Sequence, residues 1–138
     1  MKIYISKGLN LDDKKTSLIK DFCLFCAQEL SISRPCEIYV VDKREDYGIS
    51  TTAAYDPGNG KIYVYAKRRA LVDLLRSIAH EMTHMRQDEQ GLIKGPIQDI
   101  GGFHEDQANA KAGQIIKLYA RDREGGKQIY EKRSRYKN

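Results

Sequence analysis

The sequence predicts a small α+β domain, and three observations carry that prediction. Apolar residues repeat at helical spacing from Asp12 to Leu30, and again from Leu71 through the motif His80-Glu81-Met82-Thr83-His84. Short β-branched and aromatic runs lie between these two segments. We expect a three- to four-stranded mixed sheet packed on the N-terminal helix and on the helix with the two histidines, followed by a glutamate-bearing helix.

The N-terminal helix would bury a stripe made of Leu18, Ile19, Phe22, Phe25, Cys26 and Leu30. Cys23 and Cys26 form a lone C-x-x-C in this segment, and Cys36 is the one other cysteine. An odd count argues against a secreted disulfide scaffold, and without a second C-x-x-C a zinc ribbon is not expected. We interpret these thiols as parts of the core.

Three runs read as strands: Ile38 to Asp42, Thr51 to Tyr55 and Lys61 to Tyr65. The turn-forming segment Asp56-Pro57-Gly58-Asn59-Gly60 separates the last two, which predicts a tight hairpin.

The helix that follows carries the chemistry. Its buried stripe would consist of Leu71, Leu74, Leu75, Ile78, Met82 and Met85, which leaves His80 and His84 on a neighbouring face. Residues i and i+4 are close enough for two ring nitrogens to bind one zinc ion about 2 Å away. Glu81 is rotated off that pair, where it could take a proton from a zinc-bound water.

A catalytic zinc site needs a third protein ligand. The metzincin pattern is excluded, because it requires glycine at position 87 and histidine at position 90, and both are glutamine. Glu105 is the better candidate, because it opens the helical segment Glu105 to Ala112. Asn109 lies one turn further on, where it could hydrogen-bond a ligand histidine.

His104 is an alternative to Glu105. It could bind the metal, donate to the oxyanion or cap the helix, but neighbouring helical residues point about 100° apart, so the two side chains would not both bind one ion. Asp99 and Asp106 are weaker alternatives. Gly91 to Gly102 reads as the loop between the two site helices, either lining the cleft or serving only as a connector.

From about Thr51 to Tyr119 the chain resembles the gluzincins, zinc peptidases in which His-Glu-x-x-His is followed by a glutamate on the next helix. Glu105 to Ala112 looks like the Glu-x-x-Ala-Asp/Asn-x-x-Ala signature of the HtpX-like and ImmA/IrrE-like branches. The resemblance implies a zincin-like domain with one zinc per chain, bound by His80, His84 and Glu105. It also implies a general base at Glu81 and a hydrogen-bonding Asn109 where many relatives have aspartate.

By the same resemblance, Thr52, Ala53 and Ala54 would form the sheet edge that pairs with an extended protein or peptide substrate. A plain solvent-facing hairpin is the alternative. Peptide hydrolysis would also need an oxyanion donor, for which His104, Tyr119 and Tyr55 are candidates. Compact chains of this kind resemble minimal metallopeptidases of phages and bacteria.

Composition and charge predict the organisation. The 138 residues, 41% hydrophobic and 31% charged, suit one peptidase domain over residues 1–120 and a basic tail over residues 121–138. We expect a cytoplasmic monomer, since there is neither a membrane-length apolar run nor a signal segment.

The tail holds seven Lys and Arg residues against three acidic ones, out of a net charge of +5 for the chain. It is either a solvated end or an arm that contacts nucleic acid phosphates. SprT-like proteases combine His-Glu-x-x-His with DNA binding, so a DNA-associated protease is an alternative function, although their third-histidine arrangement is missing here. A non-catalytic metal-binding protein is the other alternative.

Overall fold

A computed structural model describes residues 1–45, 52–93, 102–123 and 125–130, and it confirms the α+β class. The elements are β1 (Lys2–Ile5), a 3-10 helix η1 (Lys7–Leu9), α1 (Asp13–Glu29), β2 (Glu37–Val41), β3 (Ala53–Asp56), β4 (Lys61–Tyr65), α2 (Leu71–Glu89) and α3 (Phe103–Asp122). The three predicted strands and three predicted helices are therefore present. Thr51, at the start of one predicted strand, lies outside the described residues.

The four strands form one mixed sheet in the order β1-β2-β4-β3. β1, β2 and β4 are parallel, and β3 pairs antiparallel with β4 through the predicted hairpin. β1 was not predicted: it is four residues long and begins with a lysine, and its partner β2 is more than thirty positions away. β3 occupies one edge of the sheet.

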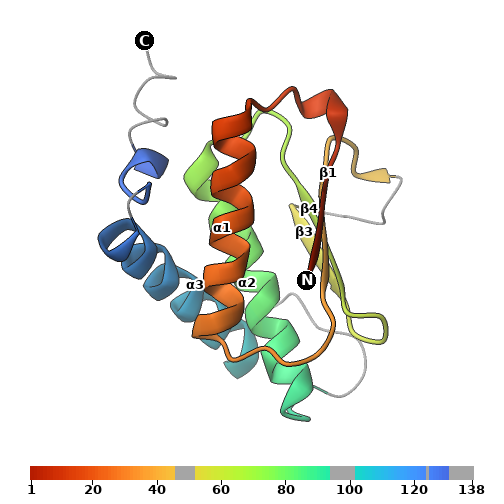
Figure 1. Cartoon of the computed structure of the whole chain (residues 1–138). Helices are drawn as coiled ribbons and strands as arrows, with labels where there is room; N and C mark the ends of the chain where they lie inside the picture. The colour runs from red at the N-terminus through yellow and green to blue at the C-terminus, as the bar shows by residue number, and fades with distance from the viewer. Residues whose placement is uncertain (46–51, 94–101, 124, 131–138) are drawn as a thin grey trace.

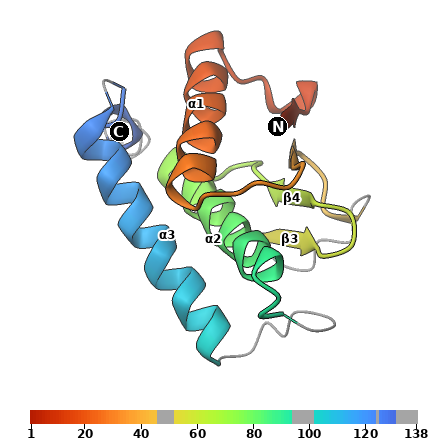
Figure 2. The ribbon, with the colours of Figure 1, turned by 60° about the horizontal axis from the view of Figure 1, so that its bottom comes forward.

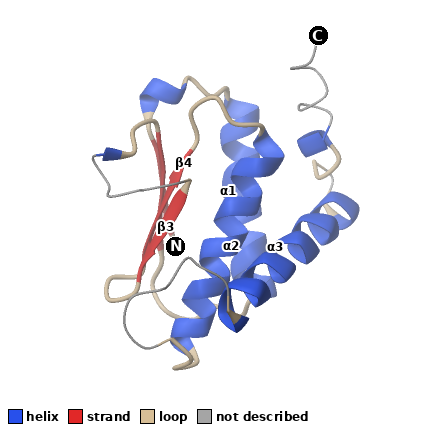
Figure 3. Cartoon of the chain, turned by 180° about the vertical axis from the view of Figure 1, so that it is seen from behind, coloured by secondary structure: helices blue, strands red, loops and turns tan. Residues whose placement is uncertain are grey.

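All three long helices cover the same face of the sheet (Figures 1 and 3). The strands alternate accordingly, with Ile38, Val40, Ile62 and Val64 completely buried under the helices. On the opposite face, Tyr4, Tyr39 and Tyr63 lie in register on the three parallel strands, and their rings stack with centroids 4.9 and 5.2 Å apart.

The core is built from the predicted stripes. The apolar residues predicted for α1 and α2 are buried, and all three thiols lie among them. Burial raises the pKa of each thiol above its ordinary value, to about 11 for Cys36, so the thiols stay protonated at neutral pH. This matches the interpretation of the cysteines as core residues.

α2 is the central helix. Figure 2 shows it between the hairpin of β3 and β4 on one side and α3 on the other. Ala108 and Ala112 of α3 are completely buried, and such small side chains permit a close approach of two helices. Because α2 is covered on both sides, it buries Glu81, Thr83, His84 and Gln87 as well as its apolar stripe.

The described part of the basic tail is packed on the domain. Ile129 is completely buried in the core, and Gly126 lies so close to the backbone of Tyr119 and Ala120 that a side chain would clash there. Residues 131–138 lie outside the described residues. In the part of the chain that the structure describes, no helix combines the length and apolar character needed to cross a membrane.

Glu89, at the end of α2, ties this helix to the segment between α1 and β2. Its carboxylate accepts the backbone N–H groups of Ser33 and Arg34, at 3.0 and 2.7 Å, and pairs with Arg86 at 3.2 Å. Burial alone would raise the pKa of Glu89, but these hydrogen bonds and the guanidinium lower it below its ordinary value.

We therefore expect Glu89→Gln to lower the free energy of unfolding by about 1–2 kcal/mol at neutral pH. A lowered folded-state pKa means that the contribution is complete above the unfolded-state value and is lost as pH falls through the folded-state value. Urea unfolding of both proteins over a falling pH series would show the difference shrinking in acid. Exposed Glu29→Gln is the control, and a difference that does not change with pH would contradict this account.

Candidate metal centre

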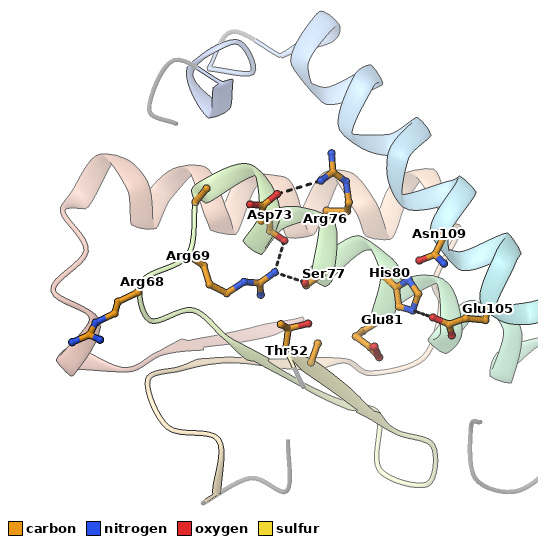
Figure 4. Close-up of a pocket in the computed structure, with 12 residues that line it drawn as sticks. Thr52, Arg68, Arg69, Asp73, Arg76, Ser77, His80, Glu81, Glu105 and Asn109 are labelled. Carbon is orange, nitrogen blue, oxygen red and sulfur yellow. Dashed lines mark hydrogen bonds and ion pairs between the residues drawn. The ribbon is translucent and has the colours of Figure 1, made fainter. Parts of the chain in front are cut away.

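Two histidines of α2 and one glutamate of α3 converge at a single point, and Figure 4 shows two of these residues, His80 and Glu105, facing each other. His80 Nε2 lies 2.9 Å from Glu105 Oε1, and His84 Nε2 lies 3.0 Å from Glu105 Oε2. The two Nε2 atoms are 3.2 Å apart. His80, His84 and Glu105 form a group that could hold a metal ion.

The spacing of these donor atoms fits a tetrahedral metal site. An ion bound at about 2.0–2.1 Å to three tetrahedral ligands separates the ligand atoms by about 3.3 Å. The two Nε2 atoms, 3.2 Å apart, are close to that value, and they lie 2.9 and 3.0 Å from different oxygens of the Glu105 carboxylate.

The contacts of Gln87 indicate which nitrogen of neutral His84 carries the proton. The amide nitrogen of Gln87 donates to the backbone carbonyl of His104 at 3.0 Å and to Gln107 Oε1 at 2.8 Å. A backbone carbonyl can only accept, so the amide oxygen of Gln87 must be the atom 2.8 Å from His84 Nδ1. We assign the proton of neutral His84 to Nδ1 from this network, which leaves Nε2 with its lone pair toward Glu105.

This tautomer makes the centre attractive to a cation. The lone pair of His84 Nε2 and the carboxylate of Glu105 are both electron-rich and lie 3.0 Å apart. Two acceptors at that distance repel each other unless a positive charge lies between them. A bound metal ion would supply that charge, so the donor set fits the predicted metal.

Sequence reasoning missed Gln87, because position 87 was considered only as a failed match to another metal pattern. A signal was available. Position 87 is three residues after His84, and side chains at i and i+3 meet on a helix just as those at i and i+4 do. Partners that hold a ligand histidine in one tautomer are a regular part of metal sites.

Glu81 lines the same cleft and is not one of the three converging donors. It is only 8% exposed, and Figure 4 shows its side chain extending toward the β3 side of His80. A carboxylate beside a metal centre, yet not part of it, can exchange protons with a molecule bound in the cleft.

The edge of β3 borders the cleft through Thr52 and Ala53. The carbonyl of Thr52 accepts the N–H of Tyr65 at 2.8 Å, so the backbone groups of Thr52 face β4. The backbone N–H and C=O groups of successive residues point to opposite sides of a strand. The groups of Ala54 therefore also face β4, whereas those of Ala53 and Tyr55 point away from the sheet. The predicted substrate edge therefore presents Ala53 and Tyr55.

The other predicted residues lie at various distances from the centre. Asn109 is exposed on α3 and lines the cleft, and its predicted contact with a ligand stays a prediction. His104 lies outside the metal-capable group, and its Nδ1 is buried without a hydrogen-bond partner among the described residues. Asp106 is exposed on α3 and also lies outside the group. Asp99 and residues 94–101 of the predicted loop lie outside the described residues.

The two candidate tyrosines are engaged elsewhere. The hydroxyl of Tyr55 donates to Asp88 at 2.6 Å, and that of Tyr119 donates to Asp21 at 2.8 Å. Burial and these carboxylates raise the pKa of both phenols, and neither residue lines the described cleft. Neither is placed to stabilise an oxyanion there.

The chain matches none of the protein-family models compared with it, and no curated protein and no solved structure matches it.

We expect Gln87→Ala to weaken metal binding at this centre by about tenfold, because His84 loses the acceptor that fixes its tautomer and ring orientation. Competition between the protein and a chromophoric chelator would measure the dissociation constant. Gln90→Ala is the matched control, since Gln90 is exposed at the end of the same helix. Equal affinities of both variants and the wild type would show that Gln87 does not support the centre.

Proposed function

We propose that this protein is a zinc-dependent peptidase that cleaves peptide bonds within extended chains. One observation carries the proposal: His80, His84 and Glu105 form a group that could hold a metal ion, in a cleft that also contains Glu81. Three protein ligands with nitrogen and oxygen donors are typical of catalytic zinc, which keeps a further position open. The resemblance to gluzincins supports the same assignment of roles.

The sheet edge supports a peptide as the substrate. Ala53, which lines the cleft, and Tyr55, two residues further along β3, turn backbone groups outward, and an extended peptide can pair with such groups as an additional strand. Backbone pairing holds the substrate through its main chain, so this contact by itself adds little preference among side chains.

When bound, zinc would supply Lewis-acid activation of a water molecule and of the substrate carbonyl. The carboxylate of Glu81 accepts the proton of the attacking water and delivers it to the nitrogen of the leaving amine. Gln87 holds the proton of His84 on Nδ1 throughout, so that Nε2 stays a ligand atom.

We expect Glu105→Ala to abolish stoichiometric zinc, because two histidines alone form an incomplete site. Elemental analysis of protein purified without a metal-affinity tag should find one zinc per wild-type chain and much less in the variant. Asp106→Ala is the matched control, a neighbouring carboxylate on α3 that lies outside the metal-capable group. Zinc retained in Glu105→Ala, or absent from the wild type after zinc is added back, would contradict the site.

Glu81→Gln should keep its zinc and lose hydrolysis by about 100-fold or more, because the amide cannot accept the proton. The measurement is mass spectrometry of a mixed peptide library incubated with each zinc-loaded protein, together with the zinc content. Glu29→Gln should behave as wild type. Unchanged cleavage by Glu81→Gln would exclude the proposed role of this carboxylate, and a zinc-loaded wild type that cleaves nothing would favour a non-catalytic metal-binding protein.

A further inference from the structure

The cleft continues well beyond the metal centre, toward the beginning of α2. It has a volume of about 650 Å³, and its far end is lined by Arg68, Arg69 and Arg76. Among the described residues that line this end, Asp73 is the one with a carboxylate. Figure 4 shows these side chains on the opposite side of His80 from Glu105. One end of the cleft is therefore basic, while the other holds the two carboxylates of the site.

Arg69 is fixed in place by its hydrogen bonds. Its Nη1 donates to the carbonyl of Tyr65 at 3.0 Å, and its Nη2 donates to the carbonyl of Asp73 at 3.0 Å and to Ser77 Oγ at 2.8 Å. These three acceptors are uncharged, while the carboxylate of Asp73 attracts the guanidinium through space and Arg44 repels it. A guanidinium has five N–H groups, and those on Nε and one on Nη1 have no partner among the described residues.

Arg76 is held less firmly. It pairs with Asp73 at 3.3 Å, one turn away on the same helix, and the two side chains are 49% and 39% exposed. A pair this exposed contributes little to stability, so Arg76 can share its N–H groups with another anion. The beginning of α2 adds a partial positive charge at the same end of the cleft.

The direction of β3 determines which part of a substrate would reach these arginines. Thr52 lines the cleft together with Ser77, whereas the hydroxyl of Tyr55 reaches Asp88, so β3 and α2 run in the same direction. Antiparallel pairing is the more common and more stable arrangement. A substrate that pairs antiparallel with β3 runs from the end of α2 toward its beginning, and its residues after the cleaved bond approach the arginines.

The distance from the metal centre indicates how many residues are involved. Helical residues rise about 1.5 Å each, so Arg76 lies about 6 Å from His80 along the axis of α2. Asp73, whose carbonyl binds the guanidinium of Arg69, lies about 10 Å from His80 along the same axis. An extended chain covers about 3.3 Å per residue. The arginines are thus within reach of the second or third residue after the cleaved bond.

We propose that this basic end of the cleft selects substrates with a carboxylate at the second or third residue C-terminal to the cleaved bond, and that Arg69 and Arg76 bind it. The carboxylate belongs either to an Asp or Glu side chain or to the chain terminus, since the chemistry of recognition is the same. This inference rests on the proposed peptidase function and names its substrate class.

Hydroxamate-capped peptides test the inference directly. The hydroxamate binds zinc in place of the cleaved bond, so only residues C-terminal to that bond are present and their positions are fixed. Three-residue probes would carry Glu, Gln or Lys at the second or third residue with a C-terminal amide, or Ala throughout with a free acid. Their dissociation constants would be measured by calorimetry with the zinc-loaded full chain.

We expect the Glu probe to bind about tenfold more tightly than its Gln counterpart, and the Lys probe to bind more weakly than both. Arg76→Gln should bring the ratio of Glu to Gln affinities toward one, and Arg76→Glu should favour the Lys probe. Arg76 is exposed, which spares the fold, and a thermal melt checks this. Arg121→Gln is the matched control, because Arg121 is an exposed arginine paired with a neighbouring aspartate on α3.

Each outcome is decisive. A preference for the free acid alone supports the inference with the chain terminus as the source of the carboxylate. Tight binding of all probes without regard to charge overturns the inference and leaves the metal centre and the peptidase intact. Failure of every hydroxamate to bind the zinc-loaded protein overturns both.

Discussion

The burial of α2 between the sheet and α3 is the constraint from which the candidate site follows. A polar side chain that is buried between a helix and its covering elements must find a protein partner, since water cannot reach it. The hydroxyl of Thr83 donates a hydrogen bond to the carbonyl of Ala79, and Nδ1 of His84 donates to Gln87. Buried polar groups with so few partners available are held in one orientation, which is what a metal centre requires.

The periodic spacing of apolar residues was sufficient to predict most of the fold. The apolar stripes of α1 and α2 and the small residues of α3 each lie on one face of a single helix, so each can be recognised from a short stretch of sequence. The structure confirms that these residues are buried. The grouping of His80, His84 and Glu105 was predictable for a related reason. Two of these residues share a helix turn, and the third begins the next predicted helix.

Features that depend on distant partners could not be read in the same way. β1 is a strand because it pairs with the edge of β2, and its four residues alone contain no signal that predicts this pairing. The basic end of the cleft joins the turn after β4 to the first turns of α2 and lies opposite the start of β3, so its arginines are unremarkable in sequence. The role of Gln87 depends on a backbone carbonyl of another helix.

The bridge made by Gln87 also links two processes that would otherwise be separate. The same amide that holds His84 is attached to the first turn of α3, and that turn presents Glu105 to the centre. Binding of an ion at this centre and the docking of α3 on α2 would therefore share a coupling free energy, and by linkage each would favour the other to the same extent. A bound ion would in this way stabilise the packing of α3 on α2, in addition to its proposed role in catalysis.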